Sequence, residues 1–231
     1  MKDNMLHSII NKKFIEIVFI IMIYVVLCAN ACINHDSIIA FVSAFCGITY
    51  TILAGKGNPL CYLIGLAGSV FYIYLAYMNH IWGNLLLYAL YFVPMQIIGF
   101  FSWIKHLKMD RYEVEKSYLK KKELILSFSL TLIISVLVIF ILYSIGDSSP
   151  IADGITSVFS LLGMYYTVKR AIEQWFVWTG VNLLSLIMWL SILFQGEKVY
   201  STVIMWFVYF ILGIYFYNSW KKDFSDYSNK S

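Results

Sequence analysis

The stretch Gln174–Phe194, QWFVWTGVNLLSLIMWLSILF, holds no charged residue and decides the fold class. A helix of about 20 mostly apolar residues is long enough to cross the hydrocarbon core of a bilayer. The stretch does not show the polar–apolar alternation of the roughly ten-residue strands in a membrane β-barrel. Because lipid offers the backbone no hydrogen-bond partner, we expect this segment to be a membrane-spanning α-helix.

Seven further stretches share this length and composition. They are Phe14–Asn34, Ser37–Ala54, Pro59–Met78, Trp82–Trp103, Leu124–Ile145, Ile151–Val168 and Val199–Ser219. The chain of 231 residues is 61% hydrophobic and only 13% charged, which is too apolar for an ordinary water-soluble domain. The sequence therefore predicts an all-α integral membrane protein with eight transmembrane helices, whose surroundings are membrane lipids.

The basic residues lie almost entirely on one side of such a membrane. If the eight spans cross in alternation, sixteen of the seventeen Lys and Arg residues fall on the side of the two termini, and only Lys198 falls on the other. The positive-inside rule then places both termini, and the long loop after Trp103, in the cytoplasm. Since acidic residues in that loop balance its basic ones, we expect no nucleic-acid partner.

The first span poses a question of processing. Lys12 and Lys13, the apolar run after them and Ala29-Asn30-Ala31 resemble a signal peptide with its cleavage site. The run is long enough to cross the membrane and Glu16 interrupts its start, so we favour a retained helix. Cleavage stays open at this stage.

Two short motifs each occur twice in the chain, and the distance between the two copies is nearly the same for both. Gly47-Ile48-Thr49-Tyr50-Thr51 recurs 116 residues later as Gly163-Met164-Tyr165-Tyr166-Thr167, and Ser102-Trp103 recurs 117 residues later as Ser219-Trp220. This predicts two units of three spans joined by the single span Leu124–Ile145. One linking helix keeps the units in the same orientation, as in the SWEET-like 3+1+3 parallel-repeat fold, with a substrate site between them.

The repeat also predicts how the chain is divided, with one extra N-terminal helix outside the core. The segments are 1–36 (N-terminal tail and extra helix), 37–104 (first three-helix repeat), 105–146 (basic cytoplasmic loop and linker helix), 147–220 (second three-helix repeat) and 221–231 (cytoplasmic tail).

One face of the span Gln174–Phe194 carries aromatic and polar side chains instead of the Leu and Ile that lipid would favour. At about 100° per residue, one stripe contains Trp175, Trp178, Thr179, Asn182, Ser185 and Trp189. Contacts between helices, and Trp residues at the membrane interface, explain such residues singly. An Asn amide at membrane depth needs protein or a ligand beside it, so the shared stripe favours a pocket.

A second polar line runs along the span Trp82–Trp103. Asn84, Tyr88 and Gln96 progress along one side of it, and Gln96 lies well inside the apolar run. An interhelical hydrogen bond and a ligand contact both explain a buried amide there. Pro94 lacks an N–H group and frees the carbonyl of the residue four positions before it, so a kink or hinge is expected.

The residue types of the two stripes indicate what they could bind. Trp and Tyr faces attract flat rings and delocalised cations, and Asn and Gln can hold an amide or hydroxyl groups. A ribosylated, positively charged aromatic ring fits this chemistry, and so does thiamine.

Motifs for other functions are missing from the sequence. Gly55-Lys56-Gly57 lacks the spacing of a phosphate-binding loop, and neither His-Glu-x-x-His nor Gly-x-Ser-x-Gly occurs. The four Cys residues have no metal-ligand spacing, so no metal site, cofactor or disulfide is expected. The span centres carry no Asp, Glu, Lys or Arg, which disfavours proton coupling without deciding it. An intramembrane enzyme and a purely structural membrane protein remain as alternatives.

Three motifs together resemble the nicotinamide riboside transporter (PnuC) family, over roughly Ser37 to Trp220. They are Trp82-Gly83-Asn84, Tyr91-x-x-Pro94-Met95-Gln96-x-x-Gly99-x-x-x-Trp103 and Trp175-x-x-Trp178-x-x-x-Asn182. The resemblance implies a SWEET-like core with one added N-terminal helix and a homotrimer in the bacterial cytoplasmic membrane. It also implies facilitated diffusion of nicotinamide riboside, a precursor of NAD.

The resemblance implies substrate-binding roles for Gln96, Trp178 and Asn182, and less directly for Trp175, Asn84 and Tyr88. Members that look alike carry thiamine or other vitamins and nucleosides, so the substrate stays open within that group. Ion coupling and the oligomeric state stay open as well.

Overall fold

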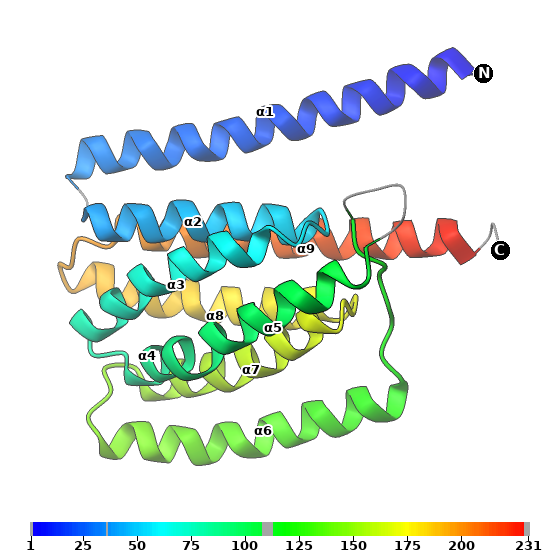
Figure 1. Cartoon of the computed structure of the whole chain (residues 1–231). Helices are drawn as coiled ribbons and strands as arrows, with labels where there is room; N and C mark the ends of the chain where they lie inside the picture. The colour runs from blue at the N-terminus through cyan, green and yellow to red at the C-terminus, as the bar shows by residue number, and fades with distance from the viewer. Residues whose placement is uncertain (1, 36, 108–112, 229–231) are drawn as a thin grey trace.

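The computed structural model describes residues 2–35, 37–107 and 113–228, with side chains described for 14–35, 37–107 and 113–223 (Figure 1). The described chain is helical, apart from two isolated β-bridges in the loops. The helices are α1 (Lys2–Asn34), α2 (Ile38–Gly55), α3 (Cys61–Met78), α4 (Trp82–Leu87), the π-helix η1 (Tyr88–Phe92), α5 (Val93–Ile104), α6 (Lys121–Ser144), α7 (Pro150–Val168), α8 (Gln174–Phe194) and α9 (Tyr200–Ser228). Eight segments of the described chain are long and apolar enough to cross a membrane, which confirms the predicted all-α fold with eight spans.

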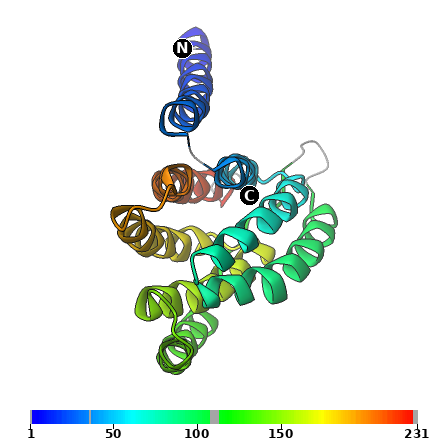
Figure 2. The same cartoon turned by 90° about the vertical axis from the view of Figure 1, so that its left-hand side faces the viewer.

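Six of these spans form a closed ring. Going round it, α2 contacts α3, α3 contacts the span made of α4, η1 and α5, this span contacts α7, α7 contacts α8, α8 contacts α9, and α9 returns to α2. Helices α1 and α6 lie outside the ring at opposite edges, α1 against α2 and α9, and α6 against α7 (Figures 1 and 2). The first span of each predicted three-helix unit therefore contacts the last span of the other. The 3+1+3 parallel repeat itself remains a prediction. The boundaries of the five segments remain a prediction.

The repeated Ser-Trp pair joins the two units in the same way at both junctions. The indole N–H of Trp103, at the end of α5, donates to the carbonyl of Thr167 in α7 at 3.0 Å. The indole N–H of Trp220, in α9, donates to the carbonyl of Gly55 at the end of α2 at 2.7 Å. Both Trp side chains are fully buried. Each unit thus anchors its last span on the final turns of the other unit's first span.

The two termini and most basic loops gather at one end of the bundle. Figure 1 places both chain ends at the end where α2 meets α3, and Lys56 and the pair Lys169-Arg170 lie in the turns there. We call this the basic end, and we call the opposite one the non-basic end. Glu16 of α1 pairs with Lys56 at 3.0 Å, so the acid in the first span is neutralised at the basic end.

Helices α1 and α6 present apolar side chains outward along their length. Ile15 and Leu126, for example, are each 66% exposed. A water-soluble protein does not expose apolar surface on this scale, whereas lipid accepts it. Helix α1 also touches the ring, because the hydroxyls of Tyr24 and Thr49 lie 2.7 Å apart. Retention of the first span in the mature chain remains a prediction.

The span that contains Pro94 is broken in the middle, as its sequence predicts. Regular α-helix stops at Leu87, the π-helix η1 follows, and α-helix resumes at Val93 with Pro94 in its first turn. Proline offers no N–H and its ring crowds the carbonyl four residues before it, here that of Leu90, so the preceding turn widens. Bending about this point remains a prediction.

Candidate functional site

The six spans of the ring surround a cavity of about 90 Å³, and none of its lining residues comes from the described parts of α1 or α6. The lining residues are Ser43, Gly47, Tyr50, Thr51, Ala54, Gly65, Gly68, Ser69, Tyr72, Tyr88, Phe92, Gln96, Met164, Thr167, Gln174, Trp175, Trp178, Asn182, Met205, Trp206 and Tyr209. Eight of these 21 side chains are aromatic and none is charged. The walls therefore suit a flat ring with a few hydrogen-bonding groups.

Five of the six predicted substrate contacts line this cavity, and they reach it from both halves of the ring. Gln96 and Tyr88 come from the broken span, and Trp175, Trp178 and Asn182 come from α8. The stripe predicted on α8 is buried or half-buried along its length. Three of its six members, Trp175, Trp178 and Asn182, line the cavity, whereas Thr179, Ser185 and Trp189 do not.

Gln96 presents its carbonyl oxygen as a free acceptor. The hydroxyl of Ser69 donates to the carbonyl of Gly65 at 2.8 Å, so its oxygen can only accept from a further partner. That partner is the Gln96 amide nitrogen, Nε2, at 2.8 Å, and this fixes which way round the amide lies. The other amide atom, Oε1, is buried without a partner. Gly65 leaves room for it, since a Cβ there would lie 3.0 Å from Oε1.

Trp178 is held rigidly by its surroundings. Its indole N–H donates to the hydroxyl oxygen of Thr167 at 2.9 Å, and that hydroxyl donates onward to the carbonyl of Gly163 at 2.8 Å. The indole ring of Trp178 lies directly over Gly163, where an added Cβ would come within 2.9 Å of the indole. Phe92 packs edge-on against it, with the ring centroids 6.1 Å apart. A ligand ring meeting this indole would therefore find it already in place.

Two indole N–H groups in the cavity wall also lack partners. Nε1 of Trp175 and Nε1 of Trp206 are buried without any hydrogen bond, and the two residues are 3% and 4% exposed. The Asn182 side chain lines the same cavity, and the residue is 4% exposed. Unpaired polar groups are costly at membrane depth, where there is no bulk water. A bound ligand with matching acceptors and donors removes that cost.

Asn84, the sixth predicted contact, lies outside the cavity lining. Its amide nitrogen Nδ2 donates to Asp153 Oδ1 in a short hydrogen bond, and its Oδ1 accepts from the Tyr72 hydroxyl at 3.4 Å. The side chain is thus fully engaged by protein, and it does not stand where a ligand in the cavity would contact it.

The aromatic residues on the opposite walls were not among the predicted contacts. Tyr50, Tyr72, Trp206 and Tyr209 all line the cavity. A usable signal was the cluster of small residues Gly65, Gly68 and Ser69 on one face of α3, because such a face leaves room beside it. The aromatic residues of α3 themselves gave little signal, because other tyrosines of the same helix face outward.

An all-helical membrane bundle that surrounds an uncharged central cavity with unpaired hydrogen-bonding groups is the architecture of a small-molecule membrane transporter. Residues 37–222 match the family described as Nicotinamide mononucleotide transporter, and the chain belongs to this family. It is thus a member of a transporter family, not an enzyme family, and the sequence-based resemblance to the PnuC family is confirmed.

Individual relatives agree with this assignment. The nicotinamide riboside transporter PnuC of Neisseria mucosa is 31% identical over 194 residues, covering 82% of this chain and 74% of the relative. The protein of the same name from Haemophilus influenzae is 26% identical over 191 residues, covering 81% and 80%. A solved structure described as the crystal structure of the vitamin B3 transporter PnuC matches with a TM-score of 0.82 and 30% identity, over 90% of this chain and 91% of that one.

Proposed function

We propose that this protein carries nicotinamide riboside through the cytoplasmic membrane, with the aromatic cavity as its binding site. The observation that carries the proposal is the uncharged aromatic wall with an unpaired amide oxygen and two unpaired indole N–H groups. Nicotinamide riboside has a cationic pyridinium ring, a carboxamide and ribose hydroxyls. The ring suits the aromatic faces through stacking and cation–π attraction, and the polar groups suit the unpaired atoms.

The cavity favours the riboside over the mononucleotide that the family description mentions. The mononucleotide adds a phosphate, which proteins hold with Arg, Lys or a cluster of backbone N–H groups. No Lys, Arg or His lines the cavity. Burying the phosphate charge without such partners costs several kcal/mol. Thiamine shares the cationic ring and a hydroxyl, so it is the alternative substrate.

The roles of individual side chains follow from the fixed groups in the wall. Trp178 stacks on the ligand ring, because its own contacts already hold it in place. Gln96 Oε1 accepts a hydrogen bond from the ligand, and Asn182 binds a second polar edge. Tyr88 and Trp175 complete the walls on either side.

The same residues support transport by facilitated diffusion. No charged side chain of the described residues lines this cavity, which fits facilitated diffusion, the mode of transport that the family resemblance implies. We place the basic end in the cytoplasm by the positive-inside rule, with both termini there. The broken span bends at η1 and Pro94 between inward- and outward-open states. A homotrimer is the assembly that we propose on the family resemblance.

Comparing three ligands on one purified preparation tests the proposed function. We expect saturable binding of nicotinamide riboside, much weaker binding of the mononucleotide, and proteoliposome uptake that stops at equal concentrations inside and outside. Preference for thiamine would reassign the substrate and keep the site. Equal binding of the mononucleotide would contradict the charge argument, and accumulation against a gradient would contradict facilitated diffusion.

Gly163→Ala is expected to weaken riboside binding about tenfold, because an added methyl group must push the Trp178 indole out of place at a cost of about 1–3 kcal/mol. Gly180→Ala is the matched control, since a Cβ at Gly180 meets nothing within 4 Å. Calorimetric titration of both variants measures the effect. Equal affinities for the two variants would show that the indole position does not matter.

A further inference from the structure

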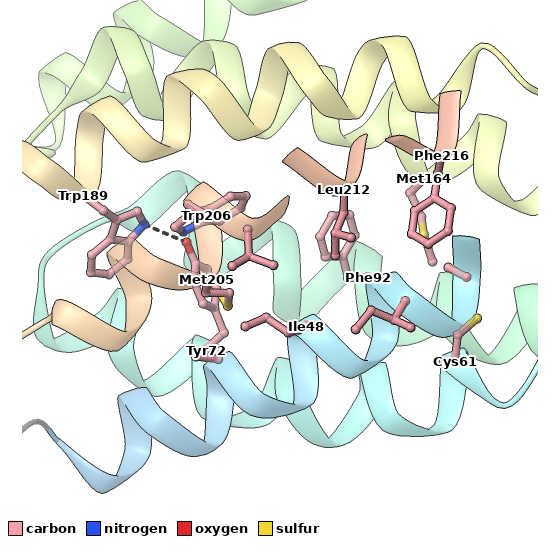
Figure 3. Close-up of a cluster of buried hydrophobic side chains, with 14 of the residues drawn as sticks. Ile48, Cys61, Tyr72, Phe92, Met164, Trp189, Met205, Trp206, Leu212 and Phe216 are labelled. Carbon is pink, nitrogen blue, oxygen red and sulfur yellow. Dashed lines mark hydrogen bonds between the residues drawn. The ribbon is translucent and has the colours of Figure 1, made fainter. Parts of the chain in front are cut away.

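Four aromatic side chains pack together where the cavity approaches the non-basic end. Tyr72 lies at their centre, with ring centroids 4.3 Å from Tyr88, 5.9 Å from Trp189 and 6.1 Å from Trp206. Figure 3 shows Tyr72 together with Trp189 and Trp206. Tyr72, Trp189 and Trp206 are each at most 4% exposed. We call these four residues the aromatic closure. Three of them line the cavity, and Trp189 lies just behind Tyr72.

The hydroxyl of Tyr72 is held between two partners. Trp189 Nε1 donates to it at 3.0 Å, as the dashed line in Figure 3 shows. An indole N–H can only donate, so the tyrosine oxygen accepts there and its own proton points to Asn84 Oδ1 at 3.4 Å. This fixes the orientation of the Asn84 amide group: Oδ1 faces Tyr72, so Nδ2 faces Asp153.

Asp153 joins this chain of hydrogen bonds to α7, and its side chain also hydrogen-bonds to that of Asp147. It is fully buried in the first turn of α7, and its carboxylate accepts from the backbone N–H groups of Gly83 at 2.8 Å and Asn84 at 3.3 Å. It also accepts from the Ser157 hydroxyl at 3.0 Å. The two backbone groups belong to the first turn of α4, where N–H groups have no partner within the helix and an anion is favoured by the helix dipole. Asp153 therefore caps α4, as an acid near a helix end is expected to do, although the helix is not its own.

We propose that Asp153 is a positioning residue for the cavity, holding Tyr72 through Asn84 in the place that closes the cavity at the non-basic end. Neither Asp153 nor Asn84 lines the cavity, so their influence on it passes through the tyrosine. The chain of hydrogen bonds runs from α7 through α4 and α3 to α8, and so crosses both halves of the ring. A shift of one half against the other must stretch it, and the aromatic closure then loses its anchor.

Accessibility of a cysteine in the cavity wall tests this proposal without any substrate. The four native cysteines are replaced by alanine, and Ser43→Cys is introduced, because Ser43 lines the cavity and is only 3% exposed. The purified protein is treated with a water-soluble methanethiosulfonate reagent, and the rate of labelling is measured by mass. We expect Tyr72→Phe and Asp153→Asn each to raise this rate about tenfold, since each removes a buried hydrogen bond that keeps the closure shut.

Two comparisons separate positioning from general loosening. Ser157→Ala removes a bond to the same carboxylate outside the path to Tyr72, so it should label at the parent rate. The double variant Asp153→Asn with Tyr72→Phe should label no faster than the faster single variant, because both act through one hydroxyl. The proposal would be overturned if the effects of the two single variants multiplied in the double variant, or if Ser157→Ala raised the labelling rate as much as Asp153→Asn does. If Asp153→Asn does not fold, Tyr72→Phe decides the test by itself: a labelling rate equal to that of the parent protein would overturn the proposal. A protein that does not bind nicotinamide riboside would leave this test unaffected.

Discussion

Trp178→Ala is expected to weaken nicotinamide riboside binding about 30-fold. Stacking and cation–π attraction to a desolvated indole contribute about 2 kcal/mol, and about 1.4 kcal/mol corresponds to a tenfold change in affinity. The indole is already fixed by Thr167, Gly163 and Phe92, so the Trp178 side chain loses little conformational entropy when the ligand binds. Calorimetric titration of the purified variant against wild type measures the loss.

Two variants control for this prediction. Trp178→Phe keeps an aromatic face but loses the N–H that donates to Thr167, so we expect a smaller loss than with alanine. Phe176→Ala removes an aromatic ring from the same helix at a position 67% exposed on the outside of the bundle, so binding should be unchanged. Wild-type affinity in Trp178→Ala would remove the stacking role from the proposal.

The sequence predicts the number and identity of the spans well, because each depends on its own length and hydrophobicity. The ends of the helices are less predictable. Helix α1 extends beyond its predicted span, from Phe14 back to Lys2, and α6 begins at Lys121, three residues before the predicted span start Leu124. A helix can continue into water, where the last turns are solvated, whereas an apolar run ends at the lipid boundary.

Helical periodicity also predicted the part of the cavity wall that α8 contributes. Residues spaced three or four apart share a face, so placing one of Trp175, Trp178 and Asn182 at the cavity places the others. Periodicity could not show that Asn84 is turned to Asp153, which lies 69 residues further along the chain. Such a contact depends on how two helices pack, and neither helix carries that information by itself.

The aromatic wall of α3 illustrates a second limit. Tyr72 is 2% exposed and lines the cavity, whereas Tyr74 and Tyr77 of the same helix are 48% and 55% exposed on its outer side. In a soluble protein the outward face would be polar and the contrast would identify the buried tyrosine. In a membrane protein both faces are apolar, so composition alone does not separate a cavity wall from a lipid-facing surface.

Gln96→Ala and Asn182→Ala are each expected to weaken riboside binding about tenfold, because a lost buried hydrogen bond costs about 1–3 kcal/mol. Both variants should remain folded and monodisperse. Asn218→Ala is the control, since that amide is exposed and bonds only to its own helix. Either cavity variant binding as wild type does would remove that residue from the site.

The double variant carries the more demanding prediction. Gln96 and Asn182 lie in different halves of the ring, so a ligand that bonds to both joins the halves as it binds. We expect the two losses to combine to about 100-fold in affinity, since the two side chains share no hydrogen bond and act on different edges of the ligand. In uptake assays the double variant should also lose transport at concentrations that saturate wild type. A double variant no weaker than either single one would mean that the two amides act at one point, and that the ligand does not bridge the halves.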